Sequence, residues 1–306
     1  MFTDEGSWTA LNGTLQLDIR WQADPGDATE SRFATLASEI PAEVEVIYAV
    51  GGGLPVDAAK FAGMKRGLNV CAVPTALSVD AHLTPASGIR REGCVFYVPT
   101  PPPVMLYVDW SVISSAPSWV RAAGICDVLS IATGLWDWRF AEQRGKQATG
   151  QKWIPYAAMI AQTLLDEALT IAKSAGNGEV AGLARLLELL ALEVQLCNLI
   201  GHSRPEEGTE HAFAYSIENL IGKGLPHGDL VGPGILAIAA AQGQSIDRLR
   251  EALLASGARL DRIPARDAET TLIDLPAYVA KHGLPFGVGH ELTERQREDA
   301  MQAVWS

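Results

Sequence analysis

Paired cysteines are missing from this sequence. Its 306 residues include four cysteines, no two of which form a Cys-x-x-Cys motif: Cys71, Cys94, Cys126 and Cys197. A chain of this length with 48% apolar residues can bury a core without covalent staples. We therefore expect reduced, buried thiols rather than a disulfide framework or a cysteine-rich metal site.

Positive charge is also scarce. Lysine and arginine number 24 against 36 aspartates and glutamates, which gives a net charge of −12 and a pI of about 5.0. Such a chain would repel the backbone of a nucleic acid, so we expect no nucleic-acid partner. A small anionic ligand could still bind in a local pocket.

Long apolar runs are absent too. The most apolar stretch, residues 234–242, is too short to span a membrane. The first residues, Met-Phe-Thr-Asp-Glu-Gly, contain neither the basic region nor the apolar run of a secretory leader. We therefore predict a cytoplasmic protein with no membrane span.

Residues 1–115 alternate between strand and helix patterns. Residues 44–50 form a continuous apolar run, typical of a strand buried on both faces of a parallel sheet. The patterns predict strands over 15–21, 44–50, 69–73, 94–98 and 104–108, and helices over 28–40 and 55–67. Gly67 is the glycine expected to end the second of these helices. This alternation predicts an α/β fold with a parallel sheet.

The chain is organised around the junction at residues 44–60. There the apolar run ends on Gly51, Gly52 and Gly53, and a helix follows. Glycines let backbone N–H groups approach an anion, and a helix N-terminus adds partial positive charge. The spacing matches neither Gly-x-Gly-x-x-Gly nor a Walker loop. From these residues alone, a phosphate site and a plain tight turn are equally compatible.

A second polar loop, residues 74–80, follows the next predicted strand. In open α/β sheets, ligands bind at the edge formed by the carboxyl ends of the strands. This loop is therefore a candidate part of a ligand site.

From residue 116 onward, β-branched runs give way to long amphipathic patterns. They predict helices over 120–142, 154–174, 180–200, 205–221, 227–242, 246–254, 268–282 and 293–305. We therefore predict two domains: an α/β domain over residues 1–115 and an all-helical domain over residues 116–306.

Three potential metal ligands lie near helix ends or breaks of the helical half: Asp127, His211 and His227. The two histidines are 16 positions apart across a break rich in glycine and proline, so an antiparallel helix pair could bring them together. His227 opens a helix, where the dipole disfavours imidazolium and keeps the ring able to bind a metal. The alternative is a pair of hydrogen-bonded, partly buried histidines.

Five motifs occur in a familiar order, at residues 51–60, 73–80, 123–130, 203–213 and 227–232. Together they resemble the superfamily of iron-containing alcohol dehydrogenases, glycerol dehydrogenases and dehydroquinate synthases, and within it the sn-glycerol-1-phosphate dehydrogenase branch. The resemblance implies an N-terminal Rossmann-like parallel-sheet domain, truncated at its start, followed by an all-helical metal-binding domain.

The resemblance also assigns roles to residues. It implies that zinc or iron is bound by Asp127, His211 and His227. It places NAD or NADP against Gly51, Gly52, Gly53, Asp57, Thr75, Ser78 and Thr84. Asp80 would face the substrate as a catalytic residue.

The implied chemistry is reversible hydride transfer between nicotinamide and a small polyol or glycerol phosphate, such as the glycerol 1-phosphate and dihydroxyacetone phosphate pair. In this chemistry a metal polarises the carbonyl or lowers the pKa of the alcohol. We expect such an enzyme to assemble as a homo-oligomer.

The chain departs from the family pattern in places. The family begins with a longer N-terminal segment, and the first six residues here look like the end of a strand and the turn after it. The branch has small residues where this chain has Glu206 and Glu207, and histidines where it has Val79 and Tyr215. Two carboxylates near a phosphate pocket would repel an anionic substrate.

Two other functions remain open. A non-catalytic relative would keep the fold but bind the cofactor weakly. A sugar-phosphate cyclase of the dehydroquinate synthase type would have glutamate in place of Asp127 and several lysines around the phosphate, and this sequence has neither feature.

Overall fold

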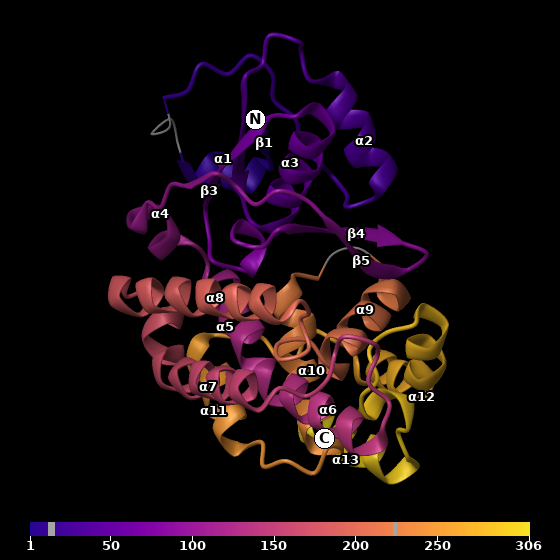
Figure 1. The fold of residues 1–306 in the computed structure, drawn as a ribbon. Helices are drawn as coiled ribbons and strands as arrows, with labels where there is room; N and C mark the ends of the chain where they lie inside the picture. Colours follow the sequence, from indigo (N-terminus) through magenta and orange to yellow (C-terminus); the bar gives the residue numbers. More distant parts are fainter. Residues whose placement is uncertain (12–15, 223–224) are drawn as a thin grey trace. The chain divides into compact units, whose positions relative to one another are not determined.

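The computed structural model describes residues 1–11, 16–222 and 225–306. These residues form two compact units, Met1–Pro117 and Ser118–Ser306 (Figure 1). The first unit contains the strands and the second is helical. No helix in the described ranges combines the length and the apolar character that a membrane crossing requires.

A parallel sheet forms the centre of the first unit. Its strands, in the described part of the chain, lie in the order β1 (Phe2–Thr3), β2 (Val46–Gly51), β3 (Asn69–Pro74) and β6 (Met105–Leu106). Each neighbouring pair is parallel. The predicted α/β class is therefore confirmed, and β1 shows that the first residues do contribute a strand.

The helices of this unit are α1 (Glu5–Leu11), α2 (Glu30–Glu39), α3 (Gly53–Arg66) and α4 (Trp110–Ser115). Phe33 of α2 and Phe61 of α3 pack against Ile47 of β2 in the main apolar core. Gly67 ends α3 in the left-handed conformation (φ 66°) and donates its N–H to the Gly63 carbonyl. The predicted helix and its terminal glycine are thus confirmed.

A hairpin follows the sheet strand β3. Its strands β4 (Ala86–Arg91) and β5 (Cys94–Pro99) are antiparallel, and a short 3-10 helix, η1 (Asp80–His82), precedes them. Both turn residues have positive φ, 52° at Glu92 and 76° at Gly93, as a tight hairpin requires. Periodicity did not predict β4, because its Ala-Ser-Gly-Ile-Arg-Arg sequence lacks an alternating apolar pattern.

The strand predicted over residues 15–21 is wrong. Residues 16–21 have no strand structure, and Leu15 lies outside the described residues. The neighbouring segment is held by isolated contacts instead, since Ala23 bridges to Phe2 and the Trp21 carbonyl accepts a hydrogen bond from the N-terminal amine at 2.7 Å. The two-residue periodicity of this segment therefore reflects one face packed on the sheet edge rather than a paired strand.

The second unit consists of helices, which Figure 1 shows in magenta to yellow. They are α5 (Ser118–Leu129), α6 (Ile131–Arg144), α7 (Pro155–Gly176), α8 (Val180–Ile200), α9 (Thr209–Ile221), α10 (His227–Ala241), α11 (Asp247–Ser256), α12 (Ala265–His282) and α13 (Glu294–Trp305), with a 3-10 turn η2 (Val288–His290). α10 is buried nearly all round and packs against α5, α9 and α13.

Two predicted helix boundaries in this unit are wrong. The helix predicted over 120–142 divides at Ser130, whose hydroxyl lies 2.6 Å from the Asp127 carbonyl. The helix predicted from residue 205 begins only at Thr209, because the preceding residues form turns. Both deviations lie beside the predicted metal ligands.

Candidate metal centre

Three helices each bring one predicted ligand to a common point. Asp127 lies near the end of α5, His211 in the first turn of α9, and His227 is the first residue of α10. One ligand atom from each lies within 4.8 Å of the other two. In the break before α10, residues 223–224 lie outside the described residues.

The distances fit a divalent ion with one adjustment. Around a tetrahedral ion with ligand distances of about 2.1 Å, neighbouring ligand atoms lie about 3.4 Å apart. Nε2 of His211 is 3.7 Å from Oδ1 of Asp127, close to this value. Nε2 of His227 is 2.8 Å from the same oxygen, a hydrogen-bond distance, so metal binding requires this pair to separate slightly.

Electrostatics favour a cation at this point. Burial alone would raise the pKa of Asp127, but His227 and His211 outweigh it and hold that pKa far below its usual range. Burial likewise opposes protonation of His211, yet hydrogen bonds to Asp127 and Glu210 raise its pKa well above 6.5. The negative charge of the ionised Asp127 can thus be balanced by a metal cation as well as by a protonated histidine.

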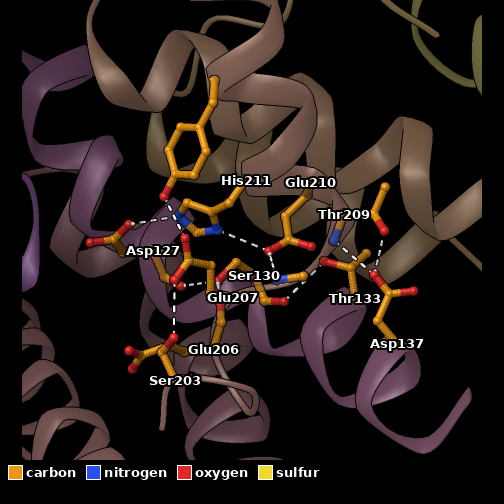
Figure 2. Close-up of polar contacts among 12 residues, drawn as sticks. Asp127, Ser130, Thr133, Asp137, Ser203, Glu206, Glu207, Thr209, Glu210 and His211 are labelled. Carbon is orange, nitrogen blue, oxygen red and sulfur yellow. Dashed lines mark hydrogen bonds and ion pairs between the residues drawn. The ribbon is translucent and has the colours of Figure 1, made fainter. Parts of the chain in front are cut away.

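Glu210 orients the His211 ring through Nδ1, the ring nitrogen that does not face Asp127 (Figure 2). Its Oε1 accepts hydrogen bonds from His211 Nδ1 at 2.9 Å and from the Gly208 N–H at 2.8 Å, and the side chain is fully buried. With Nδ1 engaged in this way, Nε2 faces Asp127. A carboxylate behind a ligating histidine is the usual arrangement in metal sites, because it fixes the tautomer and the ring orientation.

Asp137 holds the start of α9, and the sequence patterns did not single it out as a site residue. Its Oδ2 accepts hydrogen bonds from the N–H and the hydroxyl of Thr209 at 2.7 and 2.5 Å (Figure 2). Its Oδ1 accepts from Gln242 and from the Val288 N–H. A buried aspartate between two tryptophans was the available signal, since it must find such donors.

The carboxylate of Glu207 lies near His211 as well (Figure 2). It accepts hydrogen bonds from the Tyr215 hydroxyl at 2.5 Å and from the Ser203 hydroxyl at 3.0 Å. The Tyr215 ring lies 6.0 Å from the His211 ring, centroid to centroid. Tyr215 and Glu207, both departures from the family pattern, therefore bond to each other beside the predicted ligand.

The glycine turn in the first unit requires glycine on steric grounds. Gly51 has φ 142°, and a Cβ there would come within 2.9 Å of Pro55 and Ser7. A Cβ at Gly53 would lie 2.9 Å from Val79. Gly52 precedes α3 and supplies no side-chain cap, so the first N–H groups of α3 are not capped by it.

The loop after β3 is tied to this turn. The Gly51 carbonyl accepts hydrogen bonds from the Thr75 N–H at 3.3 Å and from His82 Nε2 at 3.0 Å. Ser78 Oγ lies 3.2 Å from where a Cβ on Gly52 would stand. The structure therefore brings Thr75 and Ser78 beside the glycines.

The other predicted residues of this unit have different surroundings. Asp80 begins η1, and its carbonyl accepts from the N–H of Thr84 at 3.2 Å. Asp57 faces the other way, since its carboxylate lies 3.1 Å from the buried Nζ of Lys60. Lys60 also donates to the Thr84 carbonyl at 3.3 Å. The contacts of Asp57 indicate a role in holding the loop, and give no support to direct cofactor binding.

Comparisons with known proteins agree with the family resemblance. The model of the iron-containing alcohol dehydrogenase family matches residues 9–117. A glycerol-1-phosphate dehydrogenase [NAD(P)+] of Thermofilum pendens is 31% identical over 268 residues, covering 84% of this chain and 75% of its own length. A glycerol-1-phosphate dehydrogenase [NAD(P)+] of Methanothrix thermoacetophila is 29% identical over 245 residues, covering 80% of this chain and 67% of its own length.

Solved structures share the fold. A probable glycerol dehydrogenase from Sinorhizobium meliloti superposes with a TM-score of 0.73 at 19% identity, over 99% of this chain and 88% of its own. A glycerol dehydrogenase from Schizosaccharomyces pombe gives a TM-score of 0.68 at 20% identity, over 99% and 82%.

Proposed function

The chain belongs to the iron-containing alcohol dehydrogenase family, in its glycerol-1-phosphate dehydrogenase branch, and we propose that it is a metal-dependent, NAD(P)-linked dehydrogenase of a small polyol or glycerol phosphate. The observation that carries the proposal is the convergence of Asp127, His211 and His227 from three helices. Two imidazoles and one carboxylate suit zinc or ferrous iron and leave coordination positions for a substrate oxygen.

The residues of the second unit prepare this site. Asp127 supplies a full negative charge, and Glu210 keeps Nε2 of His211 directed at Asp127. When bound, the ion would act as a Lewis acid on the substrate oxygen, and the nicotinamide would accept or donate the hydride. His211 and Glu210 are both buried, so the side of the site formed by α9 is shielded from water, whereas Asp127 and His227 are partly exposed.

We assign nucleotide binding to the first unit. Gly51, Gly52 and Gly53 form a turn with no room for a Cβ at two of its three positions, followed directly by the N-terminus of α3. Such a turn suits the pyrophosphate of NAD(P), because backbone N–H groups and the helix dipole both favour an anion. We retain Thr75, Ser78 and Thr84 as cofactor contacts and Asp80 as a substrate-facing residue; the predicted domains, 1–115 and 116–306, carry the two roles.

An absorbance assay tests the proposal. Protein loaded with zinc or ferrous iron should oxidise NADH or NADPH in the presence of dihydroxyacetone phosphate or dihydroxyacetone, and chelation should abolish the change. The absence of turnover with both compounds and other small ketones, at saturating metal, would refute the proposed activity. Calorimetry with NAD and NADP separates this outcome from a non-catalytic relative: binding in the micromolar range, about −8 kcal/mol, argues against that alternative.

We further propose a homo-oligomer located in the cytoplasm. The four cysteines form no disulfide bond in the described chain, which supports a reducing compartment. Light scattering coupled to size-exclusion chromatography tests the assembly, and cell fractionation tests the location.

A further inference from the structure

A buried carboxylate follows the ligand His227 by two residues. Asp229 is 2% exposed and lies in the first turn of α10. Arg259 donates Nε to its Oδ1 at 3.0 Å and Nη2 to its Oδ2. The guanidinium therefore forms a bidentate pair with the carboxylate, and this geometry fixes the orientation of the two groups as well as their distance.

The same guanidinium also contacts α5. Its central carbon lies 4.3 Å from the centroid of the Trp119 ring, and Trp119 belongs to the helix that carries Asp127. Gly257, in the left-handed conformation at φ 88°, turns the chain after α11 towards Ser118. Arg259 thus connects the first turn of α10 to the helix that supplies the carboxylate ligand.

The first turn of α10 has little support from its own helix. Its N-cap residue is Pro226, which forms no side-chain cap. Pro233 lies inside the helix and has no N–H, so it cannot form the helical hydrogen bond to the Asp229 carbonyl. The start of α9 differs, because Asp137 and Glu210 bond to its first residues directly.

The packing of α10 on α5 leaves no room for a shifted register. A Cβ on Gly228 would come within 2.8 Å of Ala123, so the two helices touch backbone to backbone beside His227. A small displacement of this turn would therefore change the distance between His227 and Asp127.

We propose that Arg259 and Asp229 are positioning residues for the metal centre. They hold the first turn of α10 against α5, so that His227 presents Nε2 to the ion at the correct distance from Asp127. The inference rests on the proposed function, since it assumes that these residues bind a divalent ion.

Metal binding by conservative variants tests the proposal. Arg259→Lys keeps the charge and removes the two-pronged geometry; Asp229→Asn keeps the size and removes the charge. Each should weaken Co²⁺ and Zn²⁺ binding by about 10- to 100-fold, the range known for residues that orient metal ligands. The visible absorption spectrum of the Co²⁺-loaded protein should change, because it reports coordination geometry.

Arg250→Lys is the matched control. Arg250 also ties two elements of this unit together, since its side chain in α11 donates a hydrogen bond to the Ala303 carbonyl of α13. It should lower thermal stability while leaving the cobalt spectrum unchanged and the metal affinity within about twofold of the wild type.

Three results would overturn the inference. Folded Arg259→Lys protein with wild-type metal affinity and cobalt spectrum is the first. If that variant does not fold, Trp119→Leu, which removes only the stacking partner, decides instead, and unchanged affinity there is the second. A wild-type protein that binds no divalent ion is the third, and it refutes the proposed function as well; the first two refute the inference alone.

Discussion

The glycine turn of the first unit and the metal centre of the second are built in opposite ways. The turn is a local feature, formed where β2 runs into α3, and it depends on the absence of side chains at Gly51 and Gly53. The candidate metal centre depends on side chains, and two of its proposed ligands, Asp127 and His227, are 100 residues apart in sequence.

This difference teaches where each region is vulnerable. A turn without side chains fails when atoms are added, because backbone approach is what it supplies. A ligand cluster fails when atoms are removed or displaced, because each donor is held by others behind it, as His211 is held by Glu210.

Loss of a ligand should have the largest effect. His227→Ala removes one of the three donors, so metal affinity and kcat/KM should each fall by roughly 100-fold or more. NAD(P) affinity should be unchanged, because nucleotide binding is assigned to the other unit. Metal titration, steady-state kinetics and calorimetry with NAD(P) measure the three quantities.

His282→Ala serves as its control. His282 lies at the end of α12, a helix that carries none of the three proposed ligands, and its ring contacts Tyr278. Equal losses in both variants would mean that the effect comes from general destabilisation and not from the ligand.

His82 should make the turn pH-sensitive. Burial lowers the pKa of this histidine from 6.5 to about 4. The folded protein therefore binds fewer protons than the unfolded chain between these two values, and stability must fall as the pH drops from about 6.5 towards 4. Protonation of His82 should lower the free energy of unfolding by about 3 kcal/mol between neutral pH and pH 4, at about 1.4 kcal/mol per pKa unit.

Urea unfolding of the wild type and His82→Gln, at pH 7 and pH 5, measures this contribution. On acidification the wild type loses the stability that depends on a neutral His82, whereas the variant has no such group to protonate. The unfolding free energy of the wild type minus that of the variant should therefore decrease from pH 7 to pH 5. A difference that is the same at both pH values would contradict the prediction.

Addition of one methyl group should disable the turn. Gly51→Ala places a Cβ within 2.9 Å of Pro55 and Ser7 at φ 142°, and should destabilise the protein by about 2 kcal/mol. NAD(P) affinity should fall about tenfold or more, because the glycine turn must change its backbone geometry to make room for the added Cβ. Unfolding curves and calorimetry check both values.

Gly67→Ala is a matched glycine substitution in the same unit. Gly67 also has positive φ, 66°, but a Cβ there would meet nothing within 4 Å. It should lower stability by about 1 kcal/mol and leave NAD(P) affinity unchanged. If the two variants lower NAD(P) affinity equally, the glycine turn is not a specific binding site for the cofactor.

Charge near the metal centre should have the smallest effect. Glu207→Gln removes a negative charge beside His211 while keeping the side-chain size. KM for a phosphorylated substrate should fall about two- to tenfold, on the order of 1 kcal/mol, and KM for the uncharged analogue should change little. Steady-state kinetics with dihydroxyacetone phosphate and dihydroxyacetone make the comparison.

Glu188→Gln is the distant control, since Glu188 pairs on the surface with Arg185 of its own helix. An equal change of KM for both substrates in Glu207→Gln would indicate that the hydrogen bonds of this carboxylate matter more than its charge.

Local signals predicted much of the fold. The apolar run before the glycines predicted β2, and Gly67 predicted the end of α3, because both depend on neighbouring residues. β4 and the division at Ser130 were not predicted, since the first depends on pairing with β5 and the second on side-chain contacts across the unit. Asp57 differs, because Lys60 follows it three residues later on the same helix, a spacing at which side chains meet, so this pair was readable from the sequence.

The order of the motifs, the α/β and helical halves and the identity of the candidate ligands could be read from the amino-acid sequence. These follow from periodicity, glycine placement and residue chemistry, all of which are local. The meeting of Asp127, His211 and His227 becomes visible only in the folded protein, as do the contacts by which Asp137, Glu210 and Arg259 hold the residues around them. The physical reason is distance along the chain: a contact between residues 100 positions apart exists only after the helices have packed.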